Sequence, residues 1–167
     1  LRVALSGILV RVSKQESDVR YAAIDKPVTP QDVLTLFERS ALELSRRLTS
    51  VFYVPLFRDL LPARATVVHA DARDLHKSLP DWSVGLIVTS PPYPNAYEYW
   101  LYHKYRMYWL GMDPIAARRD EIGARAHYSK KNGLNAQDFA DDMRSCFRAF
   151  SRLLHSGRYA CFLMGNS

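Results

Sequence analysis

The hydrophobic and polar positions in the first part of the chain predict helices separated by irregular polar segments. Residues 1–12 carry apolar side chains on most faces and favour a short helix or strand. A polar stretch over residues 13–25 and two prolines after it interrupt regular structure. Apolar positions then recur at helical spacing over residues 31–49, behind Thr29 as the predicted N-cap and a proline in the first turn. We therefore expect residues 1–64 to form a mostly helical accessory segment.

Strand and helix signals alternate from residue 65 onward. Residues 72–79 favour one or two helical turns, which Pro80 ends. An apolar stripe follows Asn135, a predicted N-cap, and runs to Leu154, so it predicts a helix that Gly157 closes. Three short apolar or β-branched runs predict buried strands: residues 66–70 (TVVHA), 84–89 (VGLIVT) and 159–164 (YACFLM).

This alternation predicts an α/β fold over residues 65–167, with an open sheet of about three strands and helices on both faces. Ligands of such sheets bind beyond the carboxyl ends of the strands. Asp71 directly follows the first predicted strand and Ser90 follows the second, so these two residues are candidates for the site.

Ser90 opens the most informative motif of the sequence, which continues through Pro91, Pro92 and Tyr93. Two consecutive prolines cannot donate to a sheet ladder, and they hold the chain extended with carbonyl oxygens free to accept. The Ser90 hydroxyl both donates and accepts, and the Tyr93 ring offers a flat face. The motif therefore predicts an acceptor-lined notch beside an aromatic platform, which suits an amino group on a planar ring. A rigid turn at the end of a strand is the alternative interpretation.

The same four residues resemble the catalytic motif of the DNA amino-methyltransferases, in which Asp, Asn or Ser precedes two prolines and an aromatic residue. Residues 69–93 are similar to that family's order of acidic turn, helix, strand and motif, and residues 151–167 resemble the helix and strand that follow. The resemblance covers residues 66–167. It implies a Rossmann-like class I methyltransferase sheet that is incomplete in this sequence.

In that family, serine at the first motif position is associated with cytosine-N(4) methylation, and aspartate with adenine-N(6) methylation. The resemblance implies that the target base is flipped out of duplex DNA and that Tyr93 stacks on it. It further implies that Ser90 and the Pro91 carbonyl accept hydrogen bonds from the base amine, which then attacks the methyl group of S-adenosylmethionine. The implied catalytic residues are Ser90, Pro91, Pro92 and Tyr93, the implied partner is DNA, and a cognate restriction endonuclease would suit a restriction–modification role.

Asp71 matches, in the resemblance, the acidic position whose carboxylate accepts from the adenine amine of S-adenosylmethionine. A helix N-cap is the alternative interpretation of Asp71. The family also holds the methionine part of this cofactor with a Phe-x-Gly-x-Gly turn, whereas none of the seven glycines here is separated from another by one residue. The nearest candidate, residues 165–167 (GNS), matches that turn poorly. We therefore expect a partial catalytic domain that is inactive by itself.

Two further segments carry candidate contacts to nucleic acid. Residues 93–109 hold six tyrosines and two tryptophans, which predict either a wall of the base pocket or an aromatic helix packed on the sheet. Residues 113–132 are basic and predict a long mobile loop that contacts phosphates, or else a solvated surface loop. One helical face is expected to carry Tyr97, Leu101, Tyr105 and Tyr108.

Composition narrows the class of protein. With 48% hydrophobic residues the chain is not largely disordered, and its net charge of +6 allows a polyanionic partner. Its apolar runs are too short to cross a bilayer, two cysteines fit a reducing compartment, and no secretory leader opens the chain, so we expect a cytoplasmic protein. The five histidines lack metal-ligand spacing, and the Pro-Cys dipeptide of carbon-5 cytosine methylation is absent.

Two other functions stay open at this point. The acceptor could be adenine N(6) in DNA, or an exocyclic amine in RNA, because the association of serine at the first motif position with cytosine-N(4) methylation is only a tendency. The missing glycine turn instead favours a remnant that binds nucleic acid without catalysis.

Overall fold

A computed structural model of the chain describes residues 1–17, 20, 22–54, 65–94, 97–128 and 133–164. The chain forms two compact units: the first comprises Leu1–Ala65 and Tyr99–Asp120, and the second comprises Thr66–Glu98 and Glu121–Ser167. Residues 99–120, which follow the predicted boundary near residue 64, thus belong with the N-terminal helices. The predicted division into residues 1–64 and 65–167 therefore differs from these two units, because each unit combines two separate stretches of the sequence.

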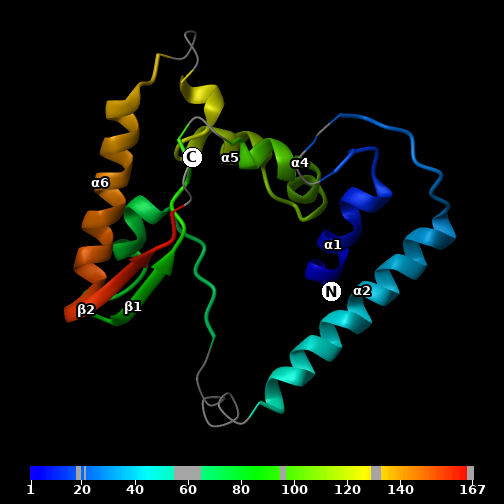
Figure 1. Ribbon diagram of the computed structural model, residues 1–167, viewed down its shortest axis with the longest axis horizontal. Helices are drawn as coiled ribbons and strands as arrows, with labels where there is room; N and C mark the ends of the chain where they lie inside the picture. Colours follow the sequence, from blue (N-terminus) through cyan, green and yellow to red (C-terminus); the bar gives the residue numbers. More distant parts are fainter. Residues whose placement is uncertain (18–19, 21, 55–64, 95–96, 129–132, 165–167) are drawn as a thin grey trace. The chain divides into compact units, whose positions relative to one another are not determined.

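The first unit is helical, with α1 (Arg2–Val12), α2 (Pro30–Phe52), α4 (Tyr99–Trp109) and α5 (Pro114–Asp120) (Figure 1). The predicted start of α2 is confirmed: Thr29 Oγ1 accepts from Asp32 N at 3.2 Å, and the Asp32 carboxylate accepts from Thr29 N at 2.9 Å. This reciprocal pair satisfies two backbone donors that a helix start leaves without partners. The amphipathic pattern therefore identified the correct helix, which extends three residues beyond residue 49.

Hydrogen bonds to backbone oxygens join α1 to its neighbours within this unit. Ser40 Oγ donates to the Ala4 carbonyl at 3.1 Å, and Arg106 Nε donates to the Ser6 carbonyl at 3.1 Å. Gln15, just after α1, is 1% exposed, and its Nε2 donates to the Tyr102 carbonyl at 3.1 Å. These bonds satisfy polar groups that packing of the helices would otherwise bury without partners.

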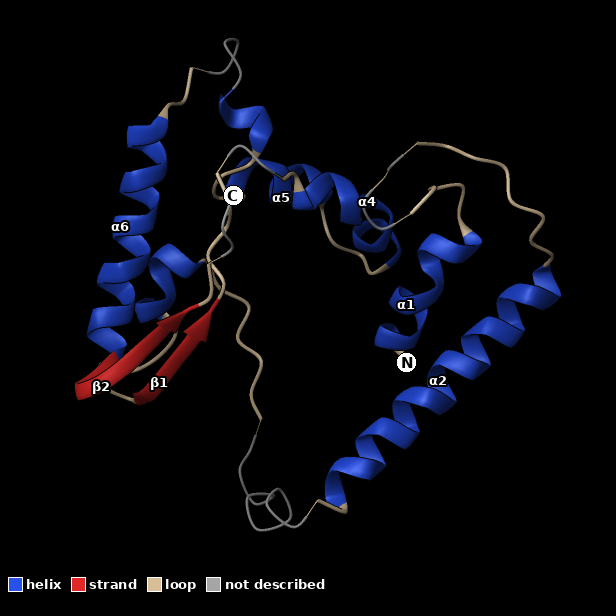
Figure 2. Ribbon diagram, in the orientation of Figure 1, coloured by secondary structure: helices blue, strands red, loops and turns tan. Residues whose placement is uncertain are grey.

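The second unit combines a two-stranded parallel sheet, β1 (Val84–Thr89) and β2 (Leu154–Phe162), with helical segments (Figure 2). Helix α6 (Ala136–Leu153) connects to β2, and the 3-10 helices are η1 (Ala72–Lys77) and η2 (Arg125–Tyr128). The chain is thus mixed α and β with a parallel strand pair, as expected. The predicted bounds of β1 and the Asn135 cap of α6 are confirmed.

The prediction of a strand at residues 66–70 is wrong. These residues carry no sheet hydrogen bonds, and Val67 is 96% exposed. A β-branched run favours extended backbone, but a strand also needs a neighbouring strand with which to pair. The described residues therefore contain two sheet strands in place of about three.

The expected junction between α6 and β2 is also wrong. Helix α6 ends at Leu153, β2 begins at the next residue, and Gly157 lies inside the strand with φ +75°. Val84 pairs with Leu154 and Leu86 pairs with Tyr159, so two steps along β1 match five along β2. Glycine tolerates the positive φ of such a bulge, and that is its role here in place of a helix C-cap.

Helix α6 covers one face of the sheet through a cluster of three phenylalanines. The Phe147 and Phe162 rings meet edge to face at 5.2 Å, and Phe150 stacks on Phe162 at 6.3 Å. Leu86 of β1 and its register partner Tyr159 of β2 are instead 56% and 74% exposed. Within the part of the second unit that the structure describes, helices therefore cover one face of the sheet, where both were expected.

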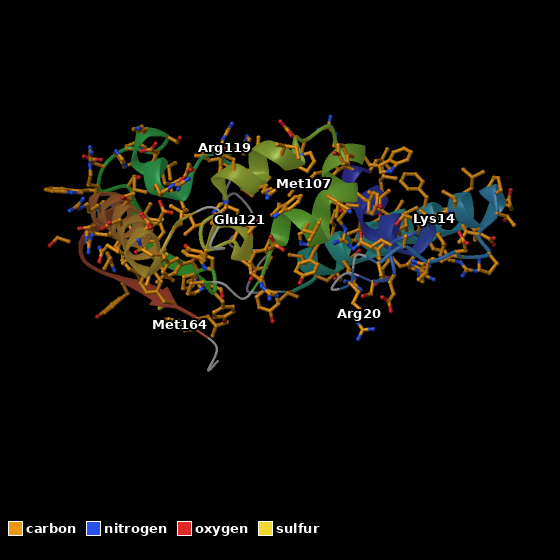
Figure 3. The ribbon with its side chains drawn as sticks, turned by 90° about the horizontal axis from the view of Figure 1, so that it is seen from above. Lys14, Arg20, Met107, Arg119, Glu121 and Met164 are labelled. Atoms are coloured by element: carbon orange, nitrogen blue, oxygen red, sulfur yellow. The ribbon has the colours of Figure 1, made fainter. Side chains whose placement is uncertain are left out.

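The end of β2 leads into exposed apolar side chains. Leu163 and Met164, the two residues after the strand, are 74% and 71% exposed (Figure 3 labels Met164). Among the described residues, no helix is both long enough and apolar enough to cross a lipid bilayer.

Candidate functional site

Ser90 stands where β1 ends, and two hydrogen bonds tie this point to the end of β2. Leu163 N donates to the Thr89 carbonyl at 2.9 Å, which extends the parallel ladder by one bond. The Ser90 hydroxyl donates in turn to the Leu163 carbonyl at 3.1 Å. The backbone directly after β2 thus fixes the position of the Ser90 side chain.

This bond also fixes what the Ser90 hydroxyl can do for a ligand. A hydroxyl has one proton to donate and two lone pairs with which to accept. Because the proton goes to the Leu163 carbonyl, Ser90 Oγ offers a ligand only lone pairs. Pro91 and Pro92 have no N–H, so their backbone offers only acceptors as well. A group that donates hydrogen bonds, such as an amine, therefore fits this strand end.

Ser90 and both prolines line one small cavity of about 80 Å³ at the strand end. That volume is well below the roughly 300–1,000 Å³ of pockets that enclose a drug-sized ligand. The cavity can thus take one edge of a planar ring, while the remainder of the ring lies outside it. The other lining residues come from five segments: Ala72, Thr89, Ile122, Met143, Cys146, Phe150 and Phe162.

Tyr93 completes the motif directly after Pro92, although it is not itself among the residues that line the cavity. Its ring is half-buried and lies 6.4 Å from the ring of Tyr97, tilted by 52°. Arg125 N donates to the Tyr97 carbonyl at 3.3 Å, and buried Gly123 packs on Pro94, where a Cβ would come within 3.5 Å of the Pro94 Cα. The segment before η2 therefore holds the end of the motif in place.

Asp71 is the N-cap of η1, as its alternative interpretation predicted. Asp71 Oδ1 accepts from Arg73 N at 2.8 Å, and Oδ2 accepts from Arg73 Nη2 at 2.6 Å. Arg73 Nη1 also donates to Asp142 Oδ1 at 2.8 Å, which links η1 to α6. These hydrogen bonds to Arg73 lower the pKa of Asp71 below its ordinary value of 3.8. Ala72, the next residue, lines the Ser90 cavity, so Asp71 lies close to the motif.

The Arg73–Asp71 pair predicts a small pH-dependent contribution to stability. A lowered carboxyl pKa contributes stability at pH values above about 4, and the contribution disappears as pH falls through the folded-state pKa. Arg73→Gln is therefore expected to lower the free energy of unfolding by about 1 kcal/mol or less at pH 7, because the pair is partly exposed. Denaturant unfolding at pH 7 and pH 3 checks this. A difference between wild type and variant that grows on acidification would contradict it.

Cys146 is the one cysteine at the cavity. It is 3% exposed, and burial, together with the nearby Asp71 carboxylate, raises the pKa of its thiol. A thiol kept protonated is a poor nucleophile, so Cys146 contributes packing to the cavity wall. No group of three or more His, Cys, Asp or Glu side chains suited to hold a metal ion occurs in the described parts of the chain.

Several cavity residues were not expected from the sequence. Met143 and Phe150 belonged to the predicted apolar stripe, but nothing local marked their approach to Ser90. The Leu163 carbonyl lies 73 positions from Ser90 in the sequence. Only the register of the parallel pair, which joins Thr89 to Phe162, brings these groups together.

Two predicted segments differ from the expectation. The supposed loop at residues 113–132 contains α5 and η2, while residues 129–132 lie outside the described part of the chain. Helix α4 begins at Tyr99, so Tyr97 does not share a helical face with Leu101. Tyr97 belongs to the unit that carries Ser90, whereas α4 belongs to the other unit.

The residues present can also be tested against S-adenosylmethionine, which the resemblance implies. Both oxygens of the Asp71 carboxylate already accept hydrogen bonds from Arg73. No two glycines in the sequence are separated by one residue, so a Gly-x-Gly turn is missing. These residues do not fit the methionine half of the cofactor, and the chain's own contribution to methyl transfer would be to bind the amine.

Comparison with known proteins gives no match: no protein-family model matches the chain, and neither does a curated protein or a solved structure.

Proposed function

We propose that this chain binds the exocyclic amino group of a DNA base for methylation, with cytosine N(4) as the first target. The observation that carries the proposal is the hydrogen bond from the Ser90 hydroxyl to the Leu163 carbonyl. It commits the only proton of the side chain to the protein, so that Ser90 accepts hydrogen bonds from its ligand. A base amine carries two N–H donors and satisfies such a site.

The same arrangement bears on the reactivity of the amine. The nitrogen lone pair of a base amine is conjugated with the ring, so the amine is a weak nucleophile. Ser90 Oγ and the Pro91 carbonyl, fixed at one strand end, would hold both N–H bonds out of the ring plane and release that lone pair. Acceptors placed in advance for the reacting geometry stabilise the transition state more than the ground state.

Tyr93 would supply a stacking surface for the flipped base. Base–aromatic stacking contributes roughly 1–3 kcal/mol per base in proteins that bind unpaired nucleic acid. Tyr93 directly follows Pro92, which lines the Ser90 cavity, and its half-buried ring suits this role because the cavity takes one edge of a base. Tyr93 and Tyr97 together form a partly exposed aromatic surface within one unit.

A second candidate function follows from the missing glycine turn. Without a site for the methionine half of S-adenosylmethionine, the same acceptors would bind a flipped or unpaired base and leave it unchanged. This non-catalytic binder shares Ser90 and Tyr93 with the first candidate and differs in its product.

Nucleoside mass spectrometry separates these functions. DNA and RNA are taken from cells that express the reading frame containing this chain, and digested to nucleosides. New N(4)-methylcytosine in DNA is the expected result. New N(6)-methyladenine would correct the base and keep the amine chemistry. A methylated amine in RNA alone would correct the nucleic acid. No new methylated base in either would overturn catalysis in favour of the binder.

Substitutions of Tyr93 test the stacking surface. Tyr93→Ala is expected to weaken binding of a duplex with an unpaired cytosine by roughly 5- to 100-fold, because it removes the ring. Tyr93→Phe keeps the ring and is expected to stay within about threefold of wild type. Fluorescence anisotropy with a labelled duplex measures both. Equal losses in the two variants would rule out stacking, since they would implicate the hydroxyl.

A further inference from the structure

A second cavity, of about 380 Å³, lies between η1 and α6 within the second unit. Its lining is strongly basic, with Arg73 and His76 from η1 and Arg148 and Arg152 from α6. Its volume is at the lower end of the roughly 300–1,000 Å³ range of small-ligand pockets. None of these four residues lines the Ser90 cavity, so the two sites are distinct.

The charges of this cavity are only partly balanced. Arg73 is paired with Asp71 and Asp142, and Arg152 Nη2 contacts Asp81 Oδ2 at 3.0 Å. Asp74, the one acidic residue in the lining, pairs with Lys77 at 2.9 Å. Arg148 is exposed, and the ion pairs that the described residues of α6 form involve Asp142, Arg144 and Arg152 instead.

His76 also lines the cavity from η1. Its Nδ1 atom is buried and has no hydrogen-bond partner among the described residues. Because that atom is shielded from solvent, the imidazole contributes to the cavity wall, and the arginine side chains supply the donors that a ligand can reach.

We propose that the cavity between η1 and α6 binds a phosphate group through Arg148 and Arg152. The planar guanidinium presents paired N–H donors that match phosphate oxygens, and the exposed Arg148 is accessible to them. This site goes beyond the proposed function, because it does not use the Ser90 motif.

Isothermal titration calorimetry with inorganic phosphate, at constant ionic strength set by chloride, tests the proposal. Arg148→Gln is expected to weaken phosphate binding at least about tenfold, because it removes the exposed guanidinium. Arg144→Gln is the matched control: it removes an equal charge one turn earlier on α6, from an exposed residue that contacts Asp141 outside the cavity. The control is expected to bind phosphate within about twofold of wild type. Circular dichroism verifies that both variants are folded.

A second titration, with duplex DNA in place of inorganic phosphate, identifies the source of the phosphate. If it is a backbone phosphate, Arg148→Gln lowers the slope of log affinity against log salt by about 1, and Arg144→Gln does not. If it belongs to a small ligand, inorganic phosphate binding depends on Arg148 and duplex binding does not. Equal effects of the two variants in the titrations with phosphate and with duplex DNA would overturn the proposed site. The absence of saturable binding of either ligand would overturn it as well.

Discussion

Ser90→Ala is expected to abolish methylation by the reading frame that contains this chain, with a loss of roughly 100- to 1,000-fold in rate. The substitution removes the oxygen that the Leu163 carbonyl holds in place as an acceptor. It also leaves the Leu163 carbonyl without its hydroxyl donor, so the site loses its order together with its chemistry. Nucleoside mass spectrometry of cellular DNA, calibrated to protein level, measures the loss.

Ser90→Thr is the matched variant for this experiment. Threonine keeps a hydroxyl that can donate to the Leu163 carbonyl, and a β-branched residue is well tolerated at a strand end. Activity within about tenfold of wild type is expected, because the acceptor oxygen is preserved. Full activity in Ser90→Ala would refute the role of Ser90 as amine acceptor. Equal loss in the alanine and threonine variants would indicate packing in place of hydrogen bonding.

The elements that the sequence predicted correctly are those with local signals. Thr29 with Asp32 and Asn135 with Asp138 form capping boxes, in which all the interacting groups lie within four residues. The run of residues 84–89 is apolar up to its last residue, Thr89, and it is β1 with the predicted bounds. Such signals depend on backbone groups near the residue itself, so a single sequence contains them.

The errors arose where a distant partner decides the structure. Residues 66–70 have the composition of a strand, yet strand formation requires a neighbour to complete the hydrogen bonds. Gly157 follows an apolar stripe and is typical of a helix C-cap, but the pairing of β2 with β1 places it in a bulge. In both cases the local preference was real and the pairing partner determined the outcome.

The candidate site shows the same contrast between local signals and distant partners. Its motif was visible in four consecutive residues, whereas the direction of the Ser90 proton depends on a carbonyl 73 positions away. Asp71 shows the reverse situation: its cap geometry comes from Arg73, two residues later, and was an expected alternative. Its role toward a cofactor stays a prediction.

The stability of the unit that carries the site depends strongly on Leu153, the last residue of α6, which is 1% exposed. Leu153→Ala is expected to lower the free energy of unfolding of this unit by about 2–5 kcal/mol, since it removes buried methyl groups and leaves a cavity. The backbone passes directly from Leu153 into β2, so loosened packing at this point should also weaken the strand pair that orients Ser90. Urea-dependent hydrogen exchange of the α6 and β2 amides, read by mass spectrometry, measures the effect in this unit.

Leu86→Ala provides the matched control, because it deletes the same atoms from a side chain that is 56% exposed on the same unit. A loss of about 1 kcal/mol or less is expected there, because little apolar area returns to water on substitution. If both variants lost the same stability, the α6–β2 junction would not be the core of the unit. If Leu153→Ala alone destabilised it, methylation should fall in parallel with the exchange protection of β2, because the Leu163 carbonyl that orients Ser90 follows directly from that strand.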